Sequence, residues 1–341
     1  MPLSKSFSRF TLQRQHVVYA MLVLCGLLFG CSEGEPHSRI DIAYSDNFLE
    51  LANGNRIHYY DEGNPHGKTI LLIHGYPSSA YLYRYIIQDL CSTEDTEFRC
   101  VAMTHVGFGK SSCPGDGGGV GPLYLVAQLQ VFIEKMDLGD MALVIHDWGG
   151  PIGAAAGMRV SDRVSHLLVL NTILTPPWEG SMDWVMDFMR VYVSQPTPLL
   201  EKVYPSLVRV AMQALTSVSL SDQSLAAYSS PFEGEAGKCR THATLNLFSK
   251  ARQDGRLFEE IEEGITQRWA GNPALLLWGN EDPLLGLDSD PDSFARIQAL
   301  LPQAETRVID GGNHFLQEDR PGEIAGEIKR FLKDESSNLQ N

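Results

Sequence analysis

Several sequence features typical of common protein functions are missing from this 341-residue chain. It contains no Cys-x-x-Cys and no His/Cys cluster at zinc-site spacing, so neither a redox motif nor a metal site is predicted. It has no run rich in Lys and Arg, and its formal net charge is −15. An acidic surface disfavours nucleic acid and anionic lipid headgroups, so we expect neither as a partner.

A Gly-x-Ser-x-Gly motif is also absent, which disfavours an ordinary esterase or lipase. We find no internal repeat and no low-complexity segment, and no motif that calls for a cofactor. With 43% hydrophobic and 20% charged residues, the chain can bury one large core or two modest ones. We therefore expect one globular core with an insertion.

Residues 1–30 have the composition of an export signal. Basic residues precede an apolar stretch over 17–29 that is too short to span a membrane comfortably. The stretch runs into Cys31 and then turns polar, which resembles a bacterial lipoprotein signal, although Phe29 is bulkier than that pattern usually has. We expect export to the periplasmic side of a bacterial envelope with a lipid anchor on Cys31. A retained, uncleaved anchor helix is the alternative.

Four further cysteines, Cys91, Cys100, Cys113 and Cys239, make an even number in a chain expected in an oxidising compartment. Cys91 and Cys100 are close enough in sequence to pair. Buried free thiols are the alternative, so the sequence alone leaves the disulfide pattern open.

From residue 39 onward, short β-branched runs alternate with helical patterns, which predicts a mostly parallel sheet covered by helices. The expected strands span 56–61, 69–73, 98–103, 141–146, 166–170, 274–278 and 306–309. The expected helices span 79–90, 122–136, 150–159, 291–301 and 321–333. The alternation stops near residue 175 and resumes near 273. The predicted organisation is therefore a signal over 1–30, a core over 31–174, a helical cap over 175–272 and a second core segment over 273–341.

One segment has the pattern of a nucleophile elbow, with an apolar strand, a sharp turn at Asp147, and a helix that begins near Gly149 and Gly150. The reactive side chain lies at the apex of such a turn, and the glycines let the helix pass close to the strand. A carboxylate there can attack a saturated carbon that bears a leaving group. An activated water then hydrolyses the resulting enzyme ester at its carbonyl, so we predict Asp147 as the nucleophile.

This chemistry requires a general base and an acid that orients it. His314 lies in a Gly-rich loop after the last expected strand, which gives the chain order nucleophile, acid, histidine. An acidic pair, Glu281 and Asp282, follows the strand after the cap, where a carboxylate could hold the imidazole tautomer. The strand before the cap ends at Asn171, which cannot serve as an anion.

Two residues near the elbow could supply hydrogen-bond donors. Tyr76 follows an expected strand, and its backbone N–H could converge with that of Trp148 on developing negative charge. The Trp148 indole N–H could also donate to a leaving anion. Simple packing over the elbow is the alternative for Trp148.

Together these motifs resemble the aspartate-nucleophile α/β-hydrolases, most closely the haloalkane dehalogenases, with epoxide hydrolases close behind. The similarity covers about residues 39–334, and its matching stretches are 74–84, 107–111, 146–150, 228–232 and 313–319. The resemblance implies an α/β-hydrolase fold: a mostly parallel eight-stranded sheet with helices on both faces and an inserted helical cap.

The resemblance also implies roles for single residues. Asp147 would form the alkyl-enzyme ester, His314 would activate the hydrolytic water, and Trp148 would bind the halide. Asp282, rather than Glu281, would orient the histidine. The cap tryptophan that supplies a second halide donor in one subgroup is missing near residues 198–206. Candidates for that second donor are Trp178, Trp184 and Tyr204.

A cap tyrosine that protonates an opening oxirane is typical of epoxide hydrolases, so Tyr192 or Tyr204 is compatible with epoxide chemistry. Residues 103–106 stand where the family usually shows Pro-Asp. We expect His105 in that stretch to be a loop histidine rather than a second base.

The leading prediction is hydrolysis of haloalkanes, which are small apolar organic substrates, with halide as a product. Epoxide hydrolysis and β-lactone-type hydrolysis or decarboxylation by the same triad are alternatives. A non-catalytic binding protein on the same fold is the least favoured one. No cofactor is predicted, the membrane is expected to be reached only through the N-terminal anchor, and the sequence does not predict the oligomeric state.

Overall fold

Eight strands form one sheet in the computed structural model, which describes residues 39–92, 96–176, 198–251 and 255–338. The strands are β1 (Asn47–Glu50), β2 (Arg56–Gly63), β3 (Lys68–Ile73), β4 (Phe98–Met103), β5 (Met141–Asp147), β6 (Val164–Thr172), β7 (Ala274–Gly279) and β8 (Glu305–Ile309). Their order across the sheet is β1-β2-β4-β3-β5-β6-β7-β8. β2 pairs antiparallel with β1 and β4, and all other neighbours pair in parallel.

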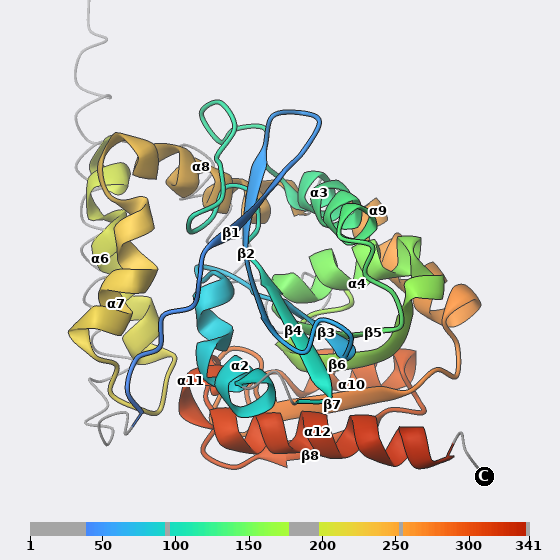
Figure 1. The fold of residues 1–341 in the computed structure, drawn as a ribbon. Coiled ribbons are helices and arrows are strands. Elements are labelled where there is room, and N and C mark those ends of the chain that lie inside the picture. The colour runs from blue at the N-terminus through green and yellow to red at the C-terminus, as the bar shows by residue number, and fades with distance from the viewer. Residues whose placement is uncertain (1–38, 93–95, 177–197, 252–254, 339–341) are drawn as a thin grey trace, which may run out of the picture.

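Helices cover both faces of this sheet (Figure 1). On one face, α4 (Gly149–Arg159) contacts α3 (Pro122–Lys135) and α9 (Arg256–Glu263), and on the other α2 (Arg84–Cys91) contacts α12 (Pro321–Asn338). The remaining core elements are α10 (Pro291–Leu300), α11 (Leu316–Asp319) and the 3₁₀ turns η1 (Ala80–Tyr83) and η2 (Ser161–Arg163).

The central strands bury side chains into two cores, one on each face. In β3, Leu71 and Ile73 join the core that includes α3 and α4, whereas Ile70 and Leu72 join the core that includes α2 and α12. Strands buried on both faces have continuous apolar sequences, and β5 and β7 show the same property. The parallel strands β5 to β8 all end at one edge of the sheet, where an α/β protein normally carries its site.

Between β6 and β7 the chain forms further helices. They are α6 (Pro198–Ala214), α7 (Asp222–Ser229), the 3₁₀ turn η4 (Ser230–Phe232), α8 (Gly234–Ala251), α9 and the π-helical turn η5 (Gly264–Arg268). α6 contacts both α7 and α8, whereas α9 packs on α4 of the core. The predicted domain division, with its cap over 175–272, stays a prediction.

The structure confirms the expected fold class, and all seven expected strands occur within a few residues of their predicted bounds. β1 and α11 were not predicted. The helix expected over 79–90 is a 3₁₀ turn followed by α2, because the Ser79 hydroxyl accepts a hydrogen bond from the Tyr81 N–H and starts a tighter turn.

The four cysteines of the described residues form two disulfides, Cys91–Cys100 and Cys113–Cys239. The first joins α2 to β4, at the spacing that the sequence allowed. The second joins the loop over 104–121, which connects β4 to α3, to α8. The alternative of free thiols is therefore wrong for these four cysteines.

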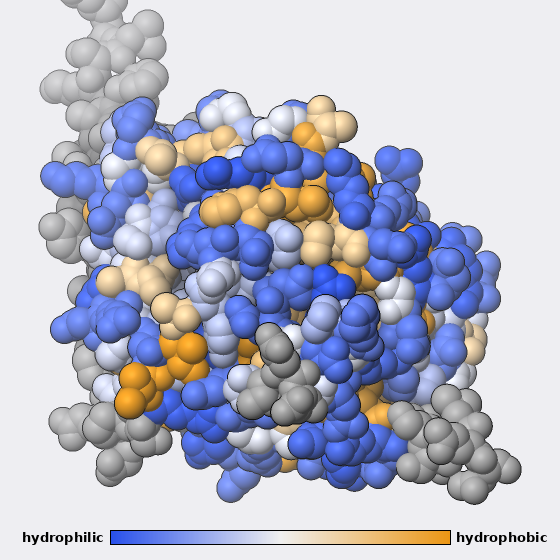
Figure 2. All heavy atoms as spheres, in the orientation of Figure 1, coloured by the Kyte–Doolittle hydropathy of each residue, from blue (hydrophilic) through white to orange (hydrophobic). Residues whose placement is uncertain are grey.

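The surface shown in Figure 2 is mostly hydrophilic, and its apolar patches are separated from one another. Within the described ranges, no helix is long and apolar enough to cross a membrane. The same part of the chain contains no group of three or more His, Cys, Asp or Glu side chains arranged to hold a metal ion.

Candidate active site

Asp147 occupies the apex of a sharp turn between β5 and α4. Its φ is 50°, in the left-handed region that a residue other than glycine seldom adopts and that is found repeatedly at functional sites. A Cβ added to Gly149 would lie 2.5 Å from the His74 carbonyl oxygen, and one added to Gly150 would lie 1.7 Å from the Thr172 hydroxyl. Only glycine fits at either position, which explains the small residues that follow the apex.

The two carboxylate oxygens of Asp147 face different groups. The Tyr76 backbone N–H donates to Oδ1 at 2.6 Å, and Oδ2 lies 3.4 Å from His314 Nε2. Gly75 makes the first approach possible, since a Cβ there would lie 2.3 Å from Oδ1. The Asp147 side chain remains 15% exposed. Oδ2 is therefore the oxygen better placed to attack a substrate, while Oδ1 is held by a donor suited to an oxyanion.

His314 lies between two carboxylates. Its Nδ1 is 2.9 Å from Asp282 Oδ2, and its Nε2 faces Asp147. Asp282 is fixed in turn by the Leu284 and Leu285 backbone N–H groups, which donate to its Oδ1 at 2.8 Å and 3.0 Å. Because this carboxylate can only accept hydrogen bonds, Nδ1 carries a proton and Nε2 is the nitrogen available for acid–base work.

Burial and charge act in opposite directions on the titration of this pair. Burial disfavours a charged imidazole, but the attraction of Asp282 and the hydrogen bonds to Asp147 and Asp282 outweigh it and raise the pKa of His314 to about 10. Burial likewise disfavours the Asp282 anion, but His314 and two backbone N–H groups lower the pKa of Asp282. The raised pKa favours a protonated His314, held by the Asp282 carboxylate, in the resting site.

Asn171, which cannot serve as the acid of the triad, instead holds Asp282 and the His314 loop in place. Its Nδ2 donates to Asp282 Oδ2 at 2.9 Å and to the Asn313 carbonyl at 3.2 Å, and its Oδ1 accepts from the Gly279 N–H at 2.8 Å. It is fully buried and has a φ of 25°. Asn171 thus joins the ends of β6 and β7 to the His314 loop. The signal available in the sequence was an amide directly after the apolar run 167–170 of β6.

Aromatic side chains surround the nucleophile. Phe248 of α8 packs edge-on against Trp148 at 5.5 Å and against Tyr76 at 5.1 Å between ring centroids. The Trp148 indole N–H donates to no residue within the described ranges. The Tyr76 hydroxyl contacts the Tyr204 hydroxyl of α6. One hydroxyl of such a pair donates to the other, so the second O–H is left to donate to a third group.

A family model described as alpha/beta hydrolase fold matches residues 68–321, a span that includes Asp147, Asp282 and His314. The chain belongs to the alpha/beta hydrolase family. It is accordingly an enzyme of the hydrolase type.

Curated relatives of this hydrolase differ in the reaction that their names describe. It is 26% identical to a cis-3-alkyl-4-alkyloxetan-2-one decarboxylase of Xanthomonas campestris over 85% of this chain and 97% of that protein. It is 29% identical to a haloalkane dehalogenase of Mycobacterium marinum over 80% of this chain and 87% of that protein. It is 26% identical to epoxide hydrolase 3 of Xenopus tropicalis over 83% of this chain and 76% of that protein. The solved structure of haloalkane dehalogenase DpaA from Paraglaciecola agarilytica shares the fold, with a TM-score of 0.70 and 23% identity over 86% of this chain and 96% of that one.

The structure places the predicted site residues of this hydrolase as follows. It brings Asp147, His314 and Asp282 together, with Tyr76 and Trp148 beside the nucleophile. Glu281 instead accepts a hydrogen bond from the Ser217 hydroxyl at 2.9 Å on the exposed side. The convergence expected for the Trp148 backbone N–H stays a prediction. The residues that lie outside the described ranges are Cys31, Trp178, Trp184 and Tyr192.

His105 lies in the loop after β4, as expected. Its ring is 4.7 Å from that of His74, and its backbone N–H donates to His74 Nε2 at 3.0 Å. Burial lowers the pKa of His105 to about 4, so the imidazole is neutral near pH 7. These contacts agree with a role in supporting the loop.

Proposed function

We propose that this hydrolase cleaves the bond between a saturated carbon and a leaving group in small apolar organic molecules, with haloalkanes as the leading substrates. Asp147 Oδ2 attacks the carbon, the carbon–halogen bond breaks with its electron pair on the halogen, and an ester forms on Asp147. The observation that carries the proposal is the Asp147 carboxylate at the elbow apex, held by the Tyr76 N–H on one side and facing His314 on the other.

The charge of the resting site suits this first step. A protonated His314 is no obstacle, because the attack requires only the Asp147 carboxylate. Once the ester has formed, Asp147 no longer carries a negative charge, so one of the causes that raise the pKa of His314 is removed and its proton is lost more readily. The neutral imidazole, still oriented by Asp282, is then a general base.

In the second step His314 Nε2 takes a proton from a water molecule, and the hydroxide attacks the carbonyl carbon of the ester. Negative charge develops on Oδ1, where the Tyr76 N–H already donates. Collapse of this intermediate releases the alcohol and regenerates the Asp147 carboxylate beside a protonated His314. The sum is one alcohol, one halide and one proton for each haloalkane and water consumed.

Donors for the departing halide are available beside the nucleophile. The Trp148 indole N–H has no acceptor within the described residues, and one O–H of the Tyr76–Tyr204 pair is not used in the contact between the two, although Thr244 is a further side-chain partner of Tyr204. Burial raises the pKa of both tyrosines, so both hydroxyls stay protonated at neutral pH. One N–H and one O–H would thus stabilise the leaving anion.

The same tyrosine pair favours epoxide hydrolysis as a second candidate. When an oxirane opens, its oxygen stays attached to the substrate and needs a proton donor rather than a halide site. A protonated hydroxyl that reaches from the cap to Tyr76, next to Asp147, suits that requirement. The decarboxylase relative adds β-lactones to the substrates worth testing.

A substrate screen with matched variants tests the proposal. The purified chain without residues 1–30 is assayed for halide release from haloalkanes, diol formation from epoxides and consumption of β-lactones, with Asp147→Asn as the inactive control. Haloalkane turnover that is lost in Asp147→Asn supports the proposal. If halide release is absent while diols form, the second candidate replaces the first.

Two conservative variants separate the donors. Trp148→Phe keeps an aromatic ring but removes the N–H, and Tyr204→Phe removes only a hydroxyl. Halide chemistry predicts the larger loss of kcat in Trp148→Phe, and epoxide chemistry predicts the larger loss in Tyr204→Phe, of about 10²-fold or more for a lost proton donor. Equal, small effects of both variants would count against either assignment.

We also propose that the chain is exported and anchored by a lipid on Cys31. The two disulfides support this location, since disulfides persist in oxidising compartments. Labelled fatty acid should enter the full-length protein in bacterial cells, and Cys31→Ala should abolish the labelling. Equal labelling of both proteins would contradict lipidation at Cys31.

A further inference from the structure

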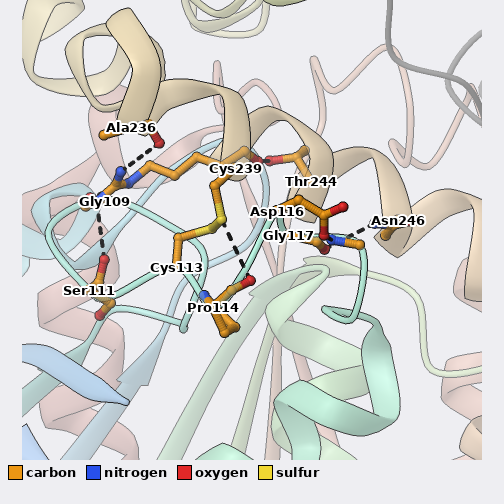
Figure 3. Close-up of a disulfide and its surroundings, with 12 residues drawn as sticks. Gly109, Ser111, Cys113, Pro114, Asp116, Gly117, Ala236, Cys239, Thr244 and Asn246 are labelled. Carbon is orange, nitrogen blue, oxygen red and sulfur yellow. Dashed lines mark hydrogen bonds between the residues drawn. A yellow bond between two sulfur atoms is a disulfide. The ribbon is translucent and has the colours of Figure 1, made fainter. Parts of the chain in front are cut away.

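Cap helix α8 is fastened to the core near its N-terminal end. Cys239 is bonded to Cys113 in the loop over 104–121 (Figure 3). The next residue, Arg240, donates to the carbonyl oxygens of Gly109 at 2.9 Å and Ser111 at 3.2 Å. One covalent bond and one bridging guanidinium therefore hold this part of α8 to the same loop.

The attachment continues along the helix. Asn246 Nδ2 donates to the Gly117 carbonyl at 3.0 Å, and Lys250 Nζ donates to the Gly118 carbonyl at 2.7 Å. A Cβ on Gly117 would lie 2.2 Å from the Cys239 carbonyl oxygen, so this glycine allows helix and loop to touch backbone to backbone. From Cys239 to Lys250, about three turns of α8 follow the loop.

A different stripe of α8 faces the candidate active site. Phe248 and Thr244, four residues apart and therefore on one side of the helix, are buried. The Phe248 ring packs edge-on against both Trp148 and Tyr76. Trp148 follows the nucleophile Asp147 in sequence, and the Tyr76 N–H donates to Asp147 Oδ1. The position of α8 therefore decides where the Phe248 ring lies relative to Asp147.

We propose that the Cys113–Cys239 disulfide is a positioning element of the substrate site, because it ties α8 to the 104–121 loop and so holds Phe248 against Trp148 and Tyr76. The proposal rests on the proposed function, in which these two residues bind the leaving group. Apart from the disulfide and the apolar packing of Ala243 and Leu247 in the core, α8 is held to the loop by hydrogen bonds from partly exposed side chains, and water competes for such bonds.

The second disulfide provides a matched control. Cys91 and Cys100 are buried and join α2 to β4, whereas Cys113 and Cys239 are only half-buried. A dithiol reductant should therefore reach Cys113–Cys239 first. Its thiolate attacks one sulfur and forms a mixed disulfide. Its second thiol then displaces the remaining cysteine, which leaves two protein thiols and an oxidised, cyclic reductant.

The experiment compares Cys113→Ser/Cys239→Ser with Cys91→Ser/Cys100→Ser in the chain without residues 1–30. We expect the first variant to raise KM by about fivefold or more with a smaller change in kcat, because Phe248 is no longer held against Trp148 and Tyr76 while the triad is untouched. Backbone amides over 234–251 should also exchange faster with deuterium. The second variant should show neither effect. Phe248→Leu should raise KM without faster exchange in α8.

The outcomes separate this inference from the proposed function. An unchanged KM in a folded Cys113→Ser/Cys239→Ser protein overturns the positioning role. If the wild type turns over no substrate, the proposed function fails, and deuterium exchange of the Cys113→Ser/Cys239→Ser protein then tests the positioning role. Faster exchange than in the wild type over both 146–150 and 234–251 supports that role, and unchanged exchange refutes it. If the variant does not fold, selective reduction of the folded wild type replaces it, with the same KM and exchange criteria.

Discussion

Replacing Asp282 by asparagine removes one charge from the centre of the site and changes almost nothing in volume. Asp282 accepts hydrogen bonds on both oxygens: Leu284 and Leu285 N–H groups donate to Oδ1, and His314 Nδ1 and Asn171 Nδ2 donate to Oδ2. The amide of asparagine has only one acceptor oxygen. If that oxygen keeps the two backbone donors, its NH₂ group faces two other donors.

His314 then has to adopt the other tautomer, with Nδ1 as acceptor and the proton on Nε2. A proton on Nε2 prevents this nitrogen from activating water, so hydrolysis of the ester stops. An equivalent Asp-to-Asn change in Ser-His-Asp triads lowers kcat by about 10⁴, or about 5.5 kcal/mol of transition-state stabilisation. The donor left without an acceptor costs a further 1–3 kcal/mol or so of folding free energy. Alkylation uses the Asp147 carboxylate, the Tyr76 N–H and the leaving-group donors, none of which the substitution removes.

Rapid mixing of enzyme and substrate, acid quenching and mass spectrometry of the peptide that contains Asp147 measure the two steps separately. Asp282→Asn should form the alkyl ester at a rate near that of the wild type and then lose it about 10⁴ times more slowly. Glu281→Gln is the control, because its side chain contacts Ser217 on the exposed side, and it should leave both rates unchanged. Wild-type ester hydrolysis in Asp282→Asn would refute the role given to Asp282.

Three further predictions concern stability. The pKa of His314 is raised from 6.5 to about 10, so between pH 6.5 and 10 the folded state binds more protons than the unfolded state. The free energy of unfolding that the wild type gains over His314→Gln is therefore fully present below pH 6.5 and should shrink as the pH rises toward 10. Urea unfolding measures this difference. The longer loop makes the Cys113–Cys239 disulfide, at a separation of 126 residues, the more stabilising one. Its loss should lower the free energy of unfolding by about 4.9 kcal/mol, whereas loss of Cys91–Cys100, at a separation of 9, should lower it by about 2.6 kcal/mol. Equal losses would contradict this order. Asn171→Ala should cost about 2 kcal/mol in the same assay and slow ester hydrolysis more than ester formation, and equal slowing of both steps would argue against its positioning role.

The sequence was sufficient to predict the parts of the fold that repeat a simple pattern. Buried parallel strands read as unbroken apolar runs, so β3, β5 and β7 were easily found. β1 has only four residues and alternates between exposed and half-buried positions, so its sequence carries little signal. The triad could be anticipated because Asp147, Asp282 and His314 each follow a parallel strand, and the ends of parallel strands share one edge of the sheet.

Contacts between the helices that follow β6 and the rest of the protein could not be predicted in this way. The Tyr76–Tyr204 pair and the contact of Phe248 with Trp148 join helices to loops with no shared periodicity. Cys113 and Cys239 are 126 residues apart in sequence, and four cysteines allow three pairings that sequence does not distinguish. Asn171 was correctly excluded as an acid, but its support of Asp282 depends on how β6 lies relative to the loops after β7 and β8, which only the structure provides.

The covalent ester on Asp147 is the central claim, and turnover in ¹⁸O-labelled water tests it most directly in the unmodified enzyme. Because water attacks the carbonyl carbon of the ester, the first turnover should give an alcohol with unlabelled oxygen and should place ¹⁸O in the carboxylate of Asp147. Mass spectrometry of the peptide over 141–159 would detect that label. An alcohol that carries ¹⁸O from the first turnover, with Asp147 unlabelled, would show that water attacks the substrate itself and would contradict the mechanism.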